Sequence, residues 1–192
     1  GYEDWHHAAL AVAQPKAEAG DPDAMLALYH IYAHLDASRL TGIYNMLGIP
    51  TRAGKWLKRA AEAGLPEAQT LWGRQIMGGR GWYFTNSRRL AEAEVWFRQA
   101  AEQDYAPGMS GVASVLISQE RYEEAWEWMQ VASQAGHIDR RFGVGWCYLD
   151  PTWSDRCQNE ADLIKGWAIL HAMTVETSNQ SAISNMRRNR DL

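Results

Sequence analysis

The sequence predicts an all-α fold, a solenoid of stacked αα-hairpin repeats. One sequence motif that combines alanines with helix-ending residues occurs four times in the 192 residues. A tryptophan precedes three of these motifs at the same spacing. No segment shows the sustained alternation of apolar and polar residues that marks a half-buried strand. Self-similarity at intervals of 44, 40 and 32 residues is typical of repeats built from two helices.

The recurring motif is typical of the end of one helix and the start of the next. Glycine, or the tolerant aspartate, favours the left-handed conformation just beyond a helix end. Pro22 and Pro66 suit the first turn of the following helix. The copies are PKAEAGDPDA (15–24), KRAAEAGLPEA (58–68), RQAAEQDYAPG (98–108) and QVASQAGHIDR (130–140), which superpose on the anchors Gly20, Gly64, Asp104 and Gly136.

A second predicted helix with one apolar face precedes each of the later motifs. Offsets of 0, 3, 4, 7 and 8 residues follow one side of an α-helix. These faces are Ala53, Trp56, Leu57, Ala60 and Ala61; Ala93, Trp96, Phe97, Ala100 and Ala101; and Ala125, Trp128, Met129, Ala132 and Ser133. Weaker copies are Ile164, Trp167, Ala168, His171 and Ala172, and an amino-terminal set broken by Pro15, namely Ala9, Val12, Ala13, Lys16 and Ala17.

The first helix of each pair carries its own seam, eight, nine and twelve residues after the anchor. A large, a small and a large side chain on one face indicate a packed helix contact. The seams are Leu28, Tyr29 and Tyr32; Trp72, Gly73 and Ile76; Val112, Ala113 and Leu116; and Val144, Gly145 and Tyr148. We therefore expect a single domain with a half-repeat at 1–19, repeats at 20–63, 64–103, 104–135 and 136–177, and a capping segment at 178–192.

The second repeat resembles a known family. AEAGLPEAQTLWGRQIMGGRGW (61–82) followed by LAEAEVWFRQAAEQD (90–104) is similar to the Sel1-like repeat, a relative of the tetratricopeptide repeat. Three further units match in part, so that the resemblance covers roughly residues 17–175. Trp72, Tyr29 and Arg140 replace the usual Leu, Gly and Ala, and the third unit lacks most of its loop. The resemblance implies a right-handed superhelix that binds other proteins and has no chemistry of its own.

Composition and charge restrict the classes of partner. With 19 Lys+Arg against 23 Asp+Glu, the net charge of -4 excludes the basic field typical of nucleic-acid binding. The acidic excess lies in residues 101–192, with 8 basic and 13 acidic residues against 11 and 10 in 1–100. No apolar stretch is long enough to predict a transmembrane segment. Because the chain begins with Gly1, we expect a bacterial periplasmic protein if a leader has been removed, and a cytoplasmic one otherwise.

Catalytic and metal-binding patterns are weak. His30 and His34 stand four residues apart with Asp36 nearby, which suits zinc on one helix face, but no HExxH motif surrounds them. The favoured interpretation is two surface histidines. No GxSxG is found, and the glycines at 78–81 and 143–145 follow no strand as a phosphate loop must. We therefore expect no enzyme activity, no cofactor and no metal.

The side of each first helix opposite the seam is the candidate partner-facing wall, at 3, 6, 10 and 13 residues after the anchor. The wall has one row of four residues in each repeat, and the row of the fourth repeat is mostly apolar. We expect its side chains to be covered either by a capping helix formed by 178–192, which would bring Ile183 and Met186 there, or by a protein partner. The rows are Asp23, Leu26, His30 and Ala33; Glu67, Thr70, Arg74 and Met77; Pro107, Ser110, Ser114 and Ile117; and Asp139, Phe142, Trp146 and Leu149.

Two further aromatic groups are candidates for partner contact. Trp126 takes the place that Gly54 and Glu94 hold in the preceding repeats, so we expect it outside the deep core. It is either an anchor for a basic peptide or an ordinary half-buried residue. Its acidic neighbours are Glu123, Glu124 and Glu127, and the second group is Trp82, Tyr83 and Phe84 on a glycine-rich loop, which either pack on a neighbouring loop or contact a partner. The connection 34–50, with Tyr44, Met46, Leu47 and Ile49, predicts a short extra helix.

Cys147 and Cys157 stand near the two ends of one connection. They either form a disulfide, if the protein is exported, or remain two thiols in a reducing cytosol. Cysteine-rich members of the family carry such pairs in every repeat, and this chain does not.

Known roles of Sel1-like proteins suggest the kind of partner. Bacterial members serve as envelope scaffolds, signalling regulators and immunity proteins that neutralise secreted antibacterial toxins, notably phospholipase effectors of type VI secretion. A compact, acidic chain with 10 tryptophans looks most like a dedicated toxin inhibitor. The alternative is a general adaptor or cell-envelope scaffold. Neither interpretation predicts whether the protein is a monomer or a dimer.

Overall fold

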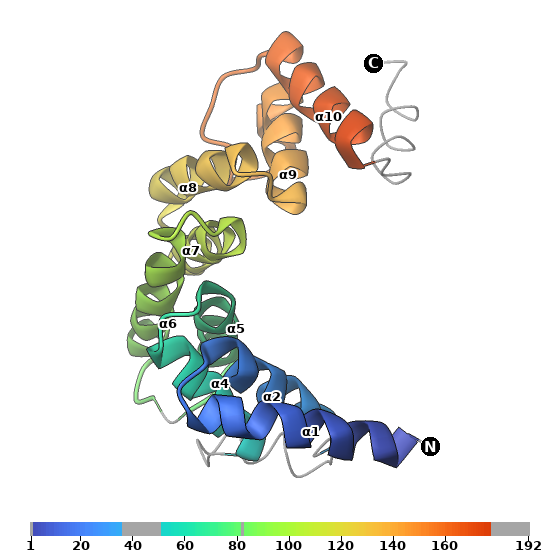
Figure 1. The fold of residues 1–192 in the computed structure, drawn as a ribbon. Helices are drawn as coiled ribbons and strands as arrows, with labels where there is room; N and C mark the ends of the chain where they lie inside the picture. The colour runs from blue at the N-terminus through green and yellow to red at the C-terminus, as the bar shows by residue number, and fades with distance from the viewer. Residues whose placement is uncertain (1, 36–50, 82, 178–192) are drawn as a thin grey trace. The chain divides into compact units, whose positions relative to one another are not determined.

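The computed structural model describes residues 2–35, 51–81 and 83–177, and its regular elements are all helical. A leading helix is followed by four consecutive pairs (Figure 1). The predicted all-α helix-pair fold is confirmed. The elements are α1 (Tyr2–Glu18); the pair α2 (Pro22–Leu35) and α4 (Arg52–Glu62); the pair α5 (Pro66–Met77) and α6 (Asn86–Ala101); the pair α7 (Ala106–Ser118) and α8 (Tyr122–Gln134); and the pair α9 (Ile138–Leu149) and α10 (Leu163–Thr177), with a short 3-10 turn η1 (Pro151–Trp153) between the last two.

Three further predictions concern residues 178–192, residues 34–50 and Pro15. The capping helix expected at 178–192 lies outside the described residues, as does nearly all of the extra helix expected at 34–50. The expected break at Pro15 is wrong, because α1 continues through it to Glu18. Proline fixes a helical φ and removes only one donor, and Pro15 lies in the last turn, where its carbonyl accepts from Ala19 N at 3.0 Å.

The predicted anchors end their helices through left-handed turns. Gly20, Gly64 and Gly136 have φ of 102°, 92° and 92°, and Asp104 has φ of 56°. At Gly64 the N–H donates to Ala61 O at 3.0 Å, and the next N–H donates to Ala60 O at 3.2 Å. The same pair of bonds closes the other three turns, and together they satisfy carbonyls that the helix end leaves unpaired.

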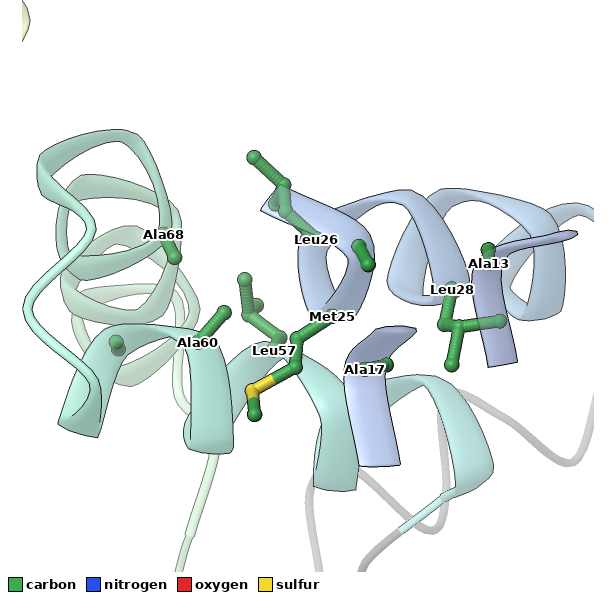
Figure 2. Packing of buried hydrophobic residues seen from close by; sticks show 10 residues of the cluster. Ala13, Ala17, Met25, Leu26, Leu28, Leu57, Ala60 and Ala68 are labelled. Atoms are coloured by element: carbon green, nitrogen blue, oxygen red, sulfur yellow. The ribbon is translucent and has the colours of Figure 1, made fainter. Parts of the chain in front are cut away.

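The chain divides into two compact units, and the boundary falls within α7. Unit 1 is residues 1–111, in which successive helices from α1 to α6 pack against one another. Its core joins Met25 and Leu28 of α2 to Leu57 of α4, with small residues of α1 and α5 around them (Figure 2). At the other end of the unit Phe97 lies against two glycines, since a Cβ added to Gly111 would come within 2.1 Å of its ring.

Unit 2 is residues 112–192, and its core gathers around Val144, Cys147 and Tyr148 of α9. Helices α9 and α10 approach closely, because a Cβ added to Gly166 would lie 2.9 Å from Gly145 O. Close approach of backbones is the usual reason for glycine at a helix crossing.

The face predicted for the last helix is wrong. Ile164 and Trp167 were expected in the core, yet they are 85% and 40% exposed, and Ala168 and His171 are exposed as well. The buried side of α10 carries Gly166, Leu170 and Met173. Its orientation follows from the close crossing at Gly166, which requires that glycine and not a tryptophan to face α9. The tryptophan spacing alone therefore gave the wrong side.

Candidate partner-binding surfaces

The aromatic surface predicted on α9 consists of Phe142 and Trp146. Both side chains are half-buried, and their ring centroids lie 6.0 Å apart in an edge-to-face arrangement with a 63° interplanar angle. Such a pair holds both rings in a defined orientation. Leu149, expected in the same surface, is also half-buried, and its side chain reaches α10, where it lies against Gly166.

The expectation that Trp126 lies outside the deep core, either as a rim anchor or as a half-buried residue, is wrong. The Trp126 side chain is 6% exposed and belongs to the core of unit 2. The indole meets the ring of Tyr148 at 5.7 Å in an edge contact. The sequence interpretation failed because the partner ring comes from α9, twenty-two positions further along, and not from the same helix. Glu123 and Glu127, the acidic neighbours in the same prediction, are exposed on α8.

The polar wall predicted in unit 1 is only partly exposed. His30 and Arg74 face solvent, and the His30 ring lies 4.9 Å from that of Tyr29. Thr70, by contrast, is 2% exposed, so its place on the wall is wrong. It lies six residues after its anchor, and Leu26 at the same position of α2 is buried too. Helices α2 and α5 each contact both the preceding and the following helix, so their buried arc is wider than one seam.

The aromatic loop divides into a packed and an exposed part. Trp82 lies outside the described residues. Tyr83 is half-buried and hydrogen-bonded to the Glu92 carboxylate; burial first, and then this contact, raises the pKa of Tyr83 to about 12. Phe84 is 89% exposed. Tyr83 therefore follows the packing alternative, whereas Phe84 projects into solvent.

A basic pocket in unit 1 was not predicted from the sequence. It has a cavity volume of about 460 Å³ and lies between α4, α5 and the connection that follows α5. The guanidinium of Arg80 lies over the Trp72 ring at 4.6 Å from the centroid. The available signal was Gly54, a glycine at the position that Glu94 and Trp126 occupy in the later repeats. The lining residues are Gly54, Lys55, Lys58, Arg59, Trp72, Ile76, Arg80, Gly81 and Tyr83.

Cys147 and Cys157 form a disulfide. It joins the buried end of α9 to the connection that leads to α10. Two hydrogen bonds fasten the same connection, from Asn159 Nδ2 to Cys147 O at 3.0 Å and from Asp162 N to Tyr148 O at 2.8 Å. The bridge therefore closes a segment that the backbone already holds against α9.

The described residues contain neither a helix that could cross a membrane nor a cluster of metal-ligating side chains. No helix in 2–35, 51–81 or 83–177 is both long and apolar enough to cross a membrane. Within the same ranges no three His, Cys, Asp or Glu side chains gather as a metal site would require. Of the histidine pair considered for zinc, His30 lies beside Tyr29, and His34 stacks on His6 with centroids 5.8 Å apart.

Helix pairs that repeat along the chain and end in the same left-handed turn define a protein of the Sel1- and tetratricopeptide-like helical repeat solenoid fold. A Sel1 repeat protein from Oxalobacter formigenes has a similar structure, with a TM-score of 0.62 and 20% sequence identity over 91% of this chain and 66% of that one. This chain thus spans just under two thirds of that protein. A second similar structure is YrrB, a TPR protein with an unusual peptide-binding site, at TM-score 0.44 and 14% identity over 94% and 90%. No protein-family model and no curated protein sequence matches the chain.

Proposed function

We propose that this protein is a noncatalytic scaffold that binds a protein partner through the aromatic surface of α9. The observation that carries the proposal is the edge-to-face pair of Phe142 and Trp146, two half-exposed aromatic rings on a helix. Large aromatic side chains that are already oriented are the usual anchors of protein interfaces. A repeat scaffold supplies them without an ordering cost on binding.

The partner we propose is a secreted antibacterial effector of the phospholipase type, which this protein neutralises as an immunity protein. Support comes from the resemblance to Sel1-like repeats and from the acidic, tryptophan-rich composition. The Cys147–Cys157 bridge favours an oxidising compartment such as the periplasm, where a toxin of this kind would be met. The alternative remains a general adaptor or envelope scaffold.

Affinity purification from the native cell distinguishes the two. An immunity protein forms one tight 1:1 complex with a toxin encoded by a neighbouring gene. Several partners bound at micromolar affinity would favour the adaptor. Turnover of a substrate by the purified protein would contradict the noncatalytic assignment.

Replacing Phe142 and Trp146 together by alanine tests the binding surface. Because buried aromatic anchors dominate interface energies, we expect the double variant to weaken the recovered complex by about 2 to 4 kcal/mol. Isothermal titration calorimetry of the complex measures the change. Trp5→Ala, which removes an exposed ring from α1 of unit 1, is the matched control and should leave affinity unchanged. Equal affinity of the double variant and the wild type would reject the α9 surface.

A further inference from the structure

The basic pocket of unit 1 holds a buried arginine, Arg80, that pairs with no carboxylate among the described residues. Arg80 is 8% exposed. Its Nη1 donates to Gln75 Oε1, and its guanidinium stacks on Trp72. No carboxylate pairs with it anywhere in the part of the chain that the structure describes. Burial lowers the pKa of Arg80, although the guanidinium of arginine stays charged. A buried cation without a counter-ion is costly unless something compensates it.

The groups that contact Arg80 are uncharged, and other contacts hold them in place. Gln75 presents its oxygen to Arg80 because its Nε2 donates to Tyr29 Oη at 3.2 Å. On the other side, Gly54 leaves the space that the guanidinium occupies, since a Cβ there would lie 2.0 Å from Arg80 Nη2. The arginine is therefore held in place by an amide, an aromatic ring and a glycine, none of which neutralises its charge.

Further cations surround the mouth of the pocket. Lys55, Lys58 and Arg59 of α4 line it together with Arg80. Among the described residues, one ion pair involves these cations and joins Lys58 Nζ to Glu62 Oε1 at 3.5 Å, between two half-exposed side chains. Such a bond in solvent is weak. Four cations against the carboxylates of Glu62 and Glu92, the latter bound to the pocket residue Tyr83, leave a positive potential at the pocket in a chain whose net charge is -4.

We propose that this pocket binds a carboxylate of an acidic protein segment, with Arg80 as the direct partner and the α4 cations guiding its approach. The fork of a guanidinium matches a carboxylate. The half-buried Trp72 supplies an apolar wall for a neighbouring side chain of the same segment, and a cavity of about 460 Å³ falls within the size range of ligand pockets. The assignment of a protein segment rests on the proposed function, whereas the anionic chemistry rests on the pocket itself.

The test uses the full chain and two labelled peptides, one of glutamates around a central leucine and one with glutamine in place of every glutamate. Fluorescence anisotropy at low salt measures their binding. We expect the glutamate peptide to bind more tightly than the glutamine peptide and to be released by added salt. Arg80→Met should weaken the glutamate peptide about tenfold or more. Arg88→Gln, at an exposed cation of α6, is the control and should change nothing.

Two further measurements separate loss of the site from loss of the fold. Arg80→Met removes an uncompensated buried charge, so its thermal midpoint should be equal to or above that of the wild type. Gly54→Ala keeps the charge but displaces the guanidinium, and should weaken the peptide with helicity retained.

Three outcomes would overturn the proposal. They are equal affinity of the two peptides, undiminished binding by Arg80→Met, and displacement of the peptide by inorganic phosphate at equal concentration, which would indicate a site for free anions. Each leaves the proposed function standing if the native partner still binds, because that interaction is tested at Phe142 and Trp146 of unit 2.

Discussion

Gly54 in unit 1 and Trp126 in unit 2 occupy the same position, ten residues before their anchors, and their surroundings differ completely. The glycine leaves room for Arg80, which arrives from the connection after α5. The indole fills the corresponding place itself and packs on Tyr148. The repeated motif thus forms similar helices in both units. The side chain at this one position determines whether the space beside the helices is an open basic pocket or part of a core.

Both units also place a cation on an aromatic ring. In unit 2 Lys165 Nζ lies 4.1 Å from the centroid of Tyr148 and donates to its Oη at 2.6 Å. Lys165 is exposed, so water shares its charge. Arg80 makes the similar contact with Trp72 while buried. The same pairing is therefore a surface contact in one unit, whereas in the other the cation is buried and pairs with no carboxylate in the part of the chain that the structure describes.

Of the changes proposed for the two units, Trp126→Ala should lower the free energy of unfolding the most. Removing a buried indole leaves a cavity, and we expect the free energy of unfolding to fall by about 3 to 5 kcal/mol. Urea denaturation followed by circular dichroism measures the loss, and hydrogen exchange should show faster opening of α8 and α9. Gly54→Ala is the matched control in unit 1, where only the flexible end of Arg80 must move. A loss below about 1 kcal/mol would contradict the place of Trp126 in the core and favour the position outside the deep core that the sequence predicts.

Helix ends were predictable because their chemistry is local. Gly20, Gly64 and Gly136 adopt positive φ where the sequence places them, since a helix that must stop selects glycine at that one residue. Asp104 takes the same conformation without being glycine. The repeat register, the order of the helix pairs and most of the core seams follow from these anchors.

Side chains whose environment comes from another repeat were not predictable. The burial of Trp126 depends on Tyr148, and that of Thr70 depends on the helices on both sides of α5. The register of α10 depends on the approach of Gly166 to α9. Arg80 occupies a pocket because Gly54 lies in a different pair. Periodicity shows which face of a helix is apolar, but not which neighbour will meet it.

Reduction of the Cys147–Cys157 disulfide should have the second largest effect and be confined to unit 2, since unit 1 contains no cysteine. The bridge spans 10 residues, and closing a loop of this length contributes about 2 to 3 kcal/mol. Thermal unfolding with and without reductant measures the change. Hydrogen exchange should rise in the connection before α10 and stay constant in α2 and α4. An equal rise in both units would contradict the division of the chain into two units.

The smallest expected effect comes from removing one tyrosine hydroxyl in each unit, that of Tyr148 in unit 2 and that of Tyr29 in unit 1. Tyr148→Phe keeps the ring against Trp126 and under Lys165, but removes the Oη that accepts from Lys165 and donates to Gln130 at 3.1 Å. We expect a loss of about 0.5 to 1.5 kcal/mol in the free energy of unfolding. Tyr29→Phe is the counterpart in unit 1, where it releases the Gln75 amide that faces Arg80. If Tyr29→Phe costs more than Tyr148→Phe, the buried network around Arg80 is the more tightly coupled of the two. The reverse order would mean that the amide contributes little to holding Arg80, and that the Trp72 ring and the space at Gly54 alone hold it in place.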